Sequence, residues 1–218
     1  MHSIALIVAG GKGLRMSSDL PKQYLEISGK SILTSTIEKF TSHPQVAAVK
    51  VVIHPEHLEL YQKATRGINL LPVSMGGERR QDSVFNGLKD LRQYQPHNVL
   101  IHDAARPFVN ADIITNSIEL LKSFAAVDVG VKPKDTIKRK GTFEIIDREQ
   151  LYCTQTPQSF HFSKILELHQ AHYNETFTDD IGLYLTESNH IGYVEGSYEN
   201  IKITTPEDLY EISRRNRF

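Results

Sequence analysis

The sequence is poor in cysteine and lacks long apolar runs. One cysteine, Cys153, among 218 residues cannot form an intrachain disulfide, so we expect a reducing compartment and a cytoplasmic location. No apolar stretch approaches the length of a membrane-spanning helix, and the first residues lack the shape of a signal peptide, so we expect no membrane association. The ten histidines show no HExxH or other metal-ligand spacing.

The sequence also lacks an excess of either charge, with 25 Lys and Arg against 26 Asp and Glu and a net charge of −1. Nucleic acids and anionic membrane surfaces attract proteins with a basic excess, so we expect neither as a partner. A local basic pocket remains compatible with this balance. The length and the 39% hydrophobic content suit one large α/β domain, and we expect a single domain over residues 1–218.

The two commonest phosphate-binding loops are missing as well. No GxxxxGK[ST] string occurs, and the stretch 11–16 has methionine where a GxGxxG fingerprint needs its third glycine. A different glycine loop, at 10–13, nevertheless follows the apolar run 4–9, which is typical of a buried parallel strand. Glycines let the backbone turn sharply and expose N–H groups to anionic oxygens.

Two cations follow this loop, Arg15 and Lys22, and together with it they indicate a nucleotide phosphate site. The alternative is a strand–turn–helix corner in which the glycines serve geometry alone.

Strands and helices alternate along the first part of the chain. We expect strands at 4–9, 46–53, 70–73, 99–102 and 125–131, with helices at 31–40, 56–64, 83–91 and 113–124. This alternation predicts an α/β fold, a mostly parallel Rossmann-like sheet with helices on both faces. Ligands bind such sheets at the carboxyl ends of the strands, where the polar loops 10–16, 76–83 and 103–107 fall.

The alternation breaks at residue 132. The charged stretch 135–147 predicts a projecting β-hairpin that turns at Lys140 and Gly141. We expect the arm 132–154 to pack on another subunit, with a solvated edge hairpin as the alternative. Beyond it we expect a turn at 155–158, helices at 163–172 and 178–185, strands at 191–195 and 200–204, and a final helix after 205–208.

Nine blocks of the sequence match one family in order. They are AGGKGLRM (9–16), PKQYL (21–25), DSV (82–84), HDAARP (102–107), DTIK (135–138), DR (147–148), QTPQ (155–158), TDD (178–180) and NIKITTPEDL (200–209). The chain thereby resembles the 2-C-methyl-D-erythritol 4-phosphate cytidylyltransferases of the non-mevalonate isoprenoid pathway, from its first strand to its last helix.

The resemblance implies a reaction and a set of site residues. CTP and methylerythritol 4-phosphate would give 4-diphosphocytidyl-methylerythritol and pyrophosphate with a divalent metal, usually Mg²⁺, on a nucleotidyltransferase-type fold that dimerises through the arm. The residues implied at the nucleotide are Ala9, Gly10, Gly11 and Gly13, with Gly77, Glu78 and Ser83 at the cytosine, Asp103 at the metal and ribose, and Ala104 and Arg106 nearby. The matching blocks also imply substrate contacts from Asp103, Thr136, Thr156, Thr178, Arg148 and Lys202.

The chemistry makes independent sense of the residue types. A phosphate monoester dianion must attack the anionic α-phosphate of CTP, so cations are needed on both sides. We expect four catalytic cations: Arg15 and Lys22 at the triphosphate and the leaving pyrophosphate, and Arg148 and Lys202 at the attacking phosphate. The nucleophile is already ionised and needs no general base. Asp103 offers the hard oxygen ligand that Mg²⁺ prefers.

One departure keeps a second substrate open. The family usually has alanine where this chain has Gly10, and an Ala-Gly-Gly start also occurs in ribitol-5-phosphate cytidylyltransferases. Those relatives commonly alter the DAARP block and the arm around Arg148, which are both intact here, so methylerythritol phosphate is favoured over ribitol phosphate. A third alternative, a non-catalytic nucleotide-binding module, would be expected to lose Arg15 or Lys22.

Overall fold

The computed structural model describes residues 2–11 and 20–215. A seven-stranded sheet, in the order β11-β7-β10-β6-β1-β4-β5, forms its centre. The strands are Ser3–Ala9 (β1), Val46–Ile53 (β4), Ser74–Met75 (β5), Asn98–Asp103 (β6), Ala126–Val131 (β7), Cys153–His161 (β10) and Gly192–Glu195 (β11). Only β10 runs antiparallel to its neighbours in this sheet, and the predicted mostly parallel sheet is confirmed.

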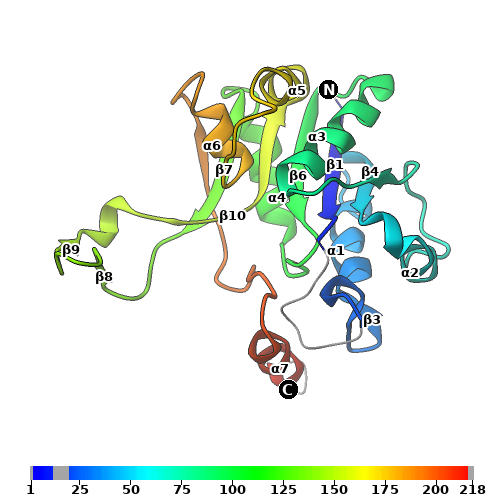
Figure 1. Cartoon of the computed structure of the whole chain (residues 1–218), viewed down its shortest axis with the longest axis horizontal. Helices are drawn as coiled ribbons and strands as arrows, with labels where there is room; N and C mark the ends of the chain where they lie inside the picture. The colour runs from blue at the N-terminus through cyan, green and yellow to red at the C-terminus, as the bar shows by residue number, and fades with distance from the viewer. Residues whose placement is uncertain (1, 12–19, 216–218) are drawn as a thin grey trace.

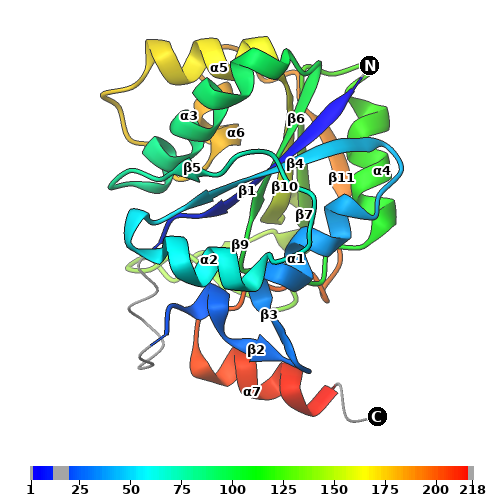
Figure 2. The same ribbon diagram turned by 90° about the vertical axis from the view of Figure 1, so that its right-hand side faces the viewer.

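Helices cover both faces of the sheet, as predicted (Figures 1 and 2). One face packs on Arg80–Leu91 (α3), Phe162–Ala171 (α5) and Asp180–Tyr184 (α6), and the other on Ile32–Thr41 (α1), Leu58–Ala64 (α2) and Ala111–Leu120 (α4). Strand β1 shows why: Ile4 and Leu6 are buried under α3, whereas Ala5 and Ile7 are buried on the face of α1 and α4. A parallel strand covered on both sides is continuously apolar.

A smaller apolar cluster lies below the sheet. The hairpin of Glu26–Ile27 (β2) and Lys30–Ser31 (β3) packs against the last helix, Pro206–Arg215 (α7), around Ile32, Ile203 and Ile212 (Figure 2). This packing brings the segment before α7 back to the loop that follows β1. The side chain of Lys22 donates a hydrogen bond to the carbonyl of Ile203 across 2.9 Å.

The predicted hairpin is present and projects from the body of the protein (Figure 1). Its strands, Ile137–Lys138 (β8) and Ile145–Ile146 (β9), pair antiparallel, and Gly141 adopts a φ of +98° in the turn. Phe143 is 77% exposed and Ile145 67% exposed. Packing of this arm on another subunit stays a prediction.

Two of the predicted strands are wrong. Residues 70–73 do not form a strand because Pro72 has no N–H to donate, and the strand begins instead at Ser74. Residues 200–204 are irregular, since side chains bind their backbone in place of a neighbouring strand. Arg106 donates to the carbonyl of Asn200 across 2.8 Å, in the same way that Lys22 does to Ile203.

The predicted turn at 155–158 is also wrong, because these residues lie inside β10. The pairing of β10 with β7 is interrupted between Gln155 and Ser159, where Pro157 lacks an N–H. A side chain bonds the strand there: Asn200 donates to the carbonyl of Thr156 across 2.9 Å. Within the described ranges, no helix is both long and apolar enough to cross a bilayer.

Candidate active site

A pocket of about 500 Å³ opens where β1 and β6 reach their carboxyl ends. Its lining includes the predicted residues Ala9, Gly10, Gly11, Lys22, Gly77, Glu78, Ser83, Asp103, Ala104 and Lys202. The fold therefore gathers residues from separate stretches of the chain into one cavity, at the edge of the sheet where the sequence analysis expected them. The predicted Gly13 and Arg15 lie outside the described residues.

The first and second glycine loops meet at a buried serine. A Cβ added to Gly10 would lie 2.7 Å from Ser83 Oγ, and one added to Gly76 would lie 2.8 Å from the same atom. Only glycine leaves room at both positions without a shift of Ser83. The hydroxyl of Ser83 accepts from the N–H of Gly77 across 3.1 Å and donates to the carbonyl of Arg79 across 3.2 Å. These bonds hold the second loop together at the point where it lies close to the first.

A buried glutamine holds the first loop from the other side. Gln23 Nε2 donates to the carbonyls of Ala9 and Gly11, each across 3.1 Å. Its neighbour Lys22 lines the pocket, so the short 3-10 helix over Lys22–Tyr24 both ties the loop and delivers a cation to it. Lys22 was predicted here from the sequence and Gln23 was not, because the only sign of its role was its place beside that lysine.

Asp103, the last residue of β6, lies at the floor of the pocket between two cations. Arg80 Nε is 3.1 Å from its Oδ1, and Lys202 Nζ is 2.7 Å from its Oδ2. Burial alone would raise the pKa of Asp103, but the charges of Arg80, Lys202 and Arg106 outweigh burial and hold the pKa below its ordinary value. Asp103 is therefore an anion with both oxygens engaged.

This arrangement sets limits on a metal. Among the residues that the structure describes, no three or more His, Cys, Asp or Glu side chains cluster in a way that could hold an ion. Asp103 offers a single carboxylate, and Mg²⁺ is often bound by one or two carboxylates together with substrate phosphates and water. The residues present fit a metal that arrives on the phosphates and shares Asp103, and they do not form a closed metal cage.

Arg106 and Thr156 lie behind the pocket rather than in its lining. Arg106 binds the carbonyl of Asn200, and Thr156 Oγ1 accepts from the backbone N–H of Asp103 across 3.1 Å. Thr156 Oγ1 also lies 3.0 Å from His102 Nδ1. Burial lowers the pKa of His102 to about 4, so this imidazole is neutral at pH 7. Thr156 therefore holds the end of β6, and Arg106 ties the loop after β6 to the segment at Asn200.

Three other predicted residues lie away from the pocket. Thr136 and Arg148 are exposed on the arm, where Arg148 donates to the carbonyl of Lys134 across 2.9 Å. Thr178 is exposed just before α6. Their substrate contacts stay predictions, and for the arm residues those contacts require another subunit or a movement of the arm.

Arg80 is the most consequential residue that the sequence analysis missed. Helix α3 begins at Arg80 and not at Ser83, so this side chain lines the pocket and bridges Asp103 and Asp180. Burial lowers the pKa of Arg80, but the two carboxylates have the larger effect and raise the pKa above its ordinary value. The signal was present: a cation at a helix N-terminus opposes the helix dipole and needs acidic partners.

Arg79, also missed, closes one side of the pocket. It binds Asp82 across 2.6 Å and donates to the carbonyls of Tyr173 and Glu175. The hydrogen bond from Arg79 lowers the pKa of Asp82. The pair ties the start of α3 to the loop that precedes α6.

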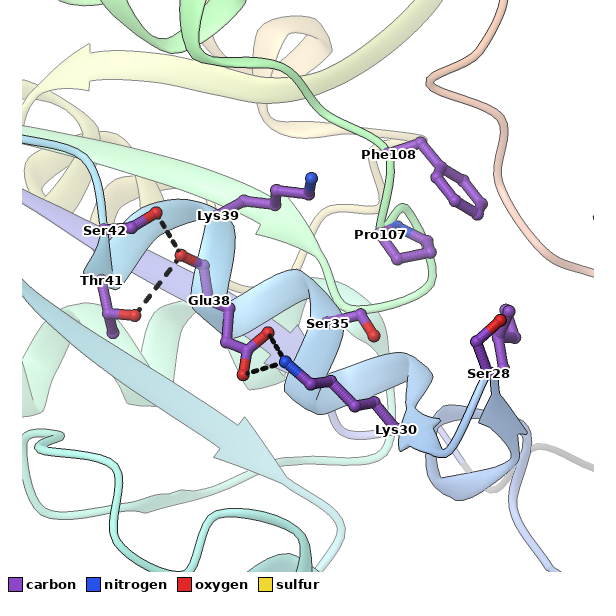
Figure 3. Close-up of a pocket in the computed structure, with 10 residues that line it drawn as sticks. Ser28, Lys30, Ser35, Glu38, Lys39, Thr41, Ser42, Pro107 and Phe108 are labelled. Atoms are coloured by element: carbon purple, nitrogen blue, oxygen red, sulfur yellow. Dashed lines mark hydrogen bonds and ion pairs between the residues drawn. The ribbon is translucent and has the colours of Figure 1, made fainter. Parts of the chain in front are cut away.

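A second hollow, of about 870 Å³, lies over α1 and the residues Pro107 and Phe108 (Figure 3). Lys30 Nζ binds Glu38 there across 2.7 Å, so Lys39 is the remaining charged residue of a lining that is otherwise made of hydroxyl and apolar side chains. None of the predicted site residues lies in it. The smaller pocket, with its glycine loops and its cluster of cations, is the candidate active site.

Comparisons with known proteins agree with this geometry. A model of the family described as 2-C-methyl-D-erythritol 4-phosphate cytidylyltransferase (IspD) matches residues 3–213. The protein of that name from Clostridium botulinum (strain Langeland) is 43% identical over 213 residues, which cover 94% of this chain and 93% of the relative.

Solved structures agree as well. The 4-diphosphocytidyl-2C-methyl-D-erythritol synthase of Anaerococcus prevotii has a TM-score of 0.88 and 28% identity, over all of this chain and 96% of that one. The 2-C-methyl-D-erythritol 4-phosphate cytidylyltransferase of Thermus thermophilus has a TM-score of 0.81 and 27% identity over the whole of both chains. The predicted nucleotidyltransferase-type α/β fold is confirmed. The chain belongs to the 2-C-methyl-D-erythritol 4-phosphate cytidylyltransferase family.

Proposed function

We propose that this protein transfers the cytidylyl group of CTP to 2-C-methyl-D-erythritol 4-phosphate, giving 4-diphosphocytidyl-2-C-methyl-D-erythritol and pyrophosphate. Family membership supports the reaction. The observation that supports this reaction for this chain is the pocket, in which two glycine loops lie with Lys22, Lys202 and the Arg80–Asp103 pair.

Positioning and charge supply the catalysis in this scheme. The acceptor phosphate is a dianion that attacks the α-phosphate of CTP directly, so no side chain has to remove a proton. Lys22, beside the first glycine loop, neutralises the triphosphate and the charge that develops on the leaving pyrophosphate. Lys202, which lines the same pocket on a flexible stem, holds the attacking phosphate in line. Arg15 joins Lys22 in this role.

The second glycine loop is the base-binding side. Gly77, Glu78 and Ser83 line the pocket together, and the hydroxyl of Ser83 anchors the N–H of Gly77. A Cβ at Gly10 would lie 2.7 Å from Ser83 Oγ, so Gly10 lies beside the base-binding loop, on the nucleotide side of the pocket. Its difference from the usual alanine therefore has no direct bearing on the acceptor, which leaves methylerythritol phosphate favoured over ribitol phosphate.

A divalent ion, Mg²⁺, would accompany the triphosphate, with Asp103 contributing an oxygen. When bound, Mg²⁺ neutralises phosphate charge and orients the α-phosphate for attack. The anionic state of Asp103, held by Arg80 and Lys202, suits this ligand role. Asp103 has acceptor sites to spare for a metal, because an ionised carboxylate offers about four lone-pair sites and each oxygen has one cation bound.

The arm would form a homodimer and complete the acceptor site. Its exposed apolar side chains, Phe143 and Ile145, are suited to burial against a second copy. Arg148 on this arm supplies a fork of donors for a phosphate dianion. A reducing, cytoplasmic setting is proposed on the single cysteine, Cys153, which is exposed and cannot pair within the chain.

Pyrophosphate release tests the proposal. With methylerythritol phosphate and Mg²⁺, we expect release from CTP, a large fall with ATP or GTP, and none after EDTA. Equal turnover of all three nucleotides would contradict the base assignment to Gly77, Glu78 and Ser83. Full activity in EDTA would contradict the metal.

A further inference from the structure

The guanidinium of Arg80 joins two carboxylates that have different surroundings. Its Nε lies 3.1 Å from Asp103 Oδ1 in the nucleotide pocket, and its Nη1 lies 2.8 Å from Asp180 Oδ2 at the start of α6. Asp180 is not part of the pocket lining, and its side chain is only 2% exposed. A planar guanidinium bound at two edges cannot rotate without breaking one of its bonds.

Asp180 is itself held on all sides. Its second oxygen, Oδ1, lies 3.0 Å from Nε2 of His169, a side chain of α5 that is 1% exposed. Its backbone N–H donates to Gln158 Oε1 on β10 across 3.1 Å. Asp180 is therefore fixed by α5, by α6 and by the sheet at once. Because Arg80 is bound to this fixed carboxylate, its guanidinium is held in place as well.

The two oxygens of Asp103 are consequently held in unequal ways. Oδ1 belongs to Arg80, which is anchored to Asp180, whereas Oδ2 belongs to Lys202, whose side chain is 38% exposed on an irregular segment. A lysine on a flexible stem exchanges partners readily, and a doubly bound arginine does not. Oδ2 is the oxygen that can be released to an incoming ligand.

We propose that Asp180 is a positioning residue for nucleotidyl transfer: acting through Arg80, it fixes Oδ1 of Asp103 and so aims Oδ2 at the nucleotide. This inference rests on the proposed function and adds to it a residue outside the pocket. Asp180 is not part of the pocket lining, and its contribution is the orientation of Asp103, the carboxylate proposed to meet the nucleotide and its metal.

The substitution Asp180→Asn tests the role, because it keeps the shape of the side chain and removes the charge that anchors Arg80. We expect turnover to fall about 10- to 100-fold, the usual scale for losing an outer partner of a ligand residue. The affinity for CTP with Mg²⁺, measured by calorimetry without the acceptor, should weaken about 10-fold, on the same outer-partner scale. The KM for methylerythritol phosphate should change by less than about twofold, because the acceptor does not depend on this anchor.

Asp179→Asn is the matched control. It removes the same charge one residue earlier, and Asn preserves the cap that Asp179 provides to the N–H of Gly182. The side chain of Asp179 binds Gln158 and Gly182 rather than Arg80, so turnover and nucleotide affinity should match the wild type. Equal losses in both variants would show a general effect on α6 and overturn the positioning role.

Arg80→Lys gives a second test that does not depend on the folding of Asp180→Asn. A lysine presents all its donors from one nitrogen and cannot reproduce the planar fork that binds Asp103 through Nε and Asp180 through Nη1, so the loss in Arg80→Lys should equal that of Asp180→Asn within about threefold. If the two residues act as one unit, the double variant should lose no more than the worse single variant. If the double variant instead loses turnover by the product of the two single losses, Asp180 acts independently of Arg80, which would overturn the inference.

The two proposals fail in different ways. A wild-type protein that releases no pyrophosphate from CTP and methylerythritol phosphate contradicts the proposed function. An active wild type whose Asp180→Asn variant retains full turnover and nucleotide affinity contradicts only the positioning role.

Discussion

Replacing Lys202 with methionine removes the charge on the exchangeable oxygen of Asp103 and keeps most of the apolar stem. In the native protein Lys202 Nζ lies 2.7 Å from Asp103 Oδ2, and the lysine side chain is 38% exposed. A buried acceptor left without a donor costs about 1 to 3 kcal/mol. Because water can reach a side chain this exposed, we expect the free energy of unfolding to fall by about 1 kcal/mol, at the low end.

The effect on turnover should be much larger than the effect on stability. A fall of about 1 kcal/mol lowers the melting temperature of a chain of this size by about 2 to 4 °C. The loss of one preorganised charge at the transition state lowers kcat by about 10²- to 10³-fold. Asp103 retains Arg80 on its other oxygen, so the site keeps its shape while losing a phosphate-binding cation.

Thermal unfolding and steady-state pyrophosphate release measure the two quantities on the same preparation. Lys30→Met is the matched control, because Lys30 Nζ also lies 2.7 Å from a carboxylate, that of Glu38, but outside the active-site pocket. We expect it to retain full turnover. A folded Lys202→Met protein with turnover within about threefold of the wild type would refute the role of Lys202, and an equal loss in Lys30→Met would refute its specificity.

Changes at the other charged residues have equally distinct outcomes. Lys22→Ala, like Arg15→Ala, should lower turnover by about 10²-fold or more with little change in stability, and a folded variant with near-normal turnover would remove that residue from the mechanism. Mixing the inactive Arg148→Ala and Lys22→Ala variants should partly restore activity if the arm acts across a dimer; no recovery after confirmed subunit exchange would place Arg148 in its own subunit's site or outside catalysis. Asp180→Asn should reduce the free energy of unfolding at pH 7 by about 1 to 3 kcal/mol, since it breaks a largely buried ion pair. Burial raises the pKa of Asp180, but the effect of Arg80 and His169 is larger and brings the pKa below its ordinary 3.8. The ion pair therefore stabilises the fold above about pH 4, and this stabilisation is lost as the pH falls below that value. In urea unfolding, the difference in the free energy of unfolding between wild type and Asp180→Asn should be smaller at pH 3 than at pH 7. An equal difference at the two pH values would contradict the ion pair.

Features set by neighbouring residues could be predicted from the sequence. The continuous apolar run of β1 and the glycines after it follow local rules, and so does the cap of α1, where Ser31 Oγ accepts from the N–H of Thr34 across 3.0 Å. Because parallel strands align their carboxyl ends, the loops after β1 and β6 had to meet. The prediction of a pocket containing Lys22 and Asp103 needed nothing more.

Features set by distant residues could not be predicted in this way. Arg80 and Asp180 are 100 positions apart, and their pairing decides what Arg80 does. The segment 200–204 is apolar enough to resemble a strand, yet its backbone is bound by side chains such as those of Lys22 and Arg106. Periodicity in the sequence carries no record of such partners.

A single competition experiment measures which acceptor phosphate the protein uses. The protein is given CTP, Mg²⁺ and equal concentrations of methylerythritol 4-phosphate and ribitol 5-phosphate, and the cytidyl products are separated and identified by mass spectrometry. We expect 4-diphosphocytidyl-methylerythritol to predominate and to accumulate in step with pyrophosphate. CDP-ribitol as the main product would contradict this substrate assignment, and so would the absence of both products from an intact, folded protein.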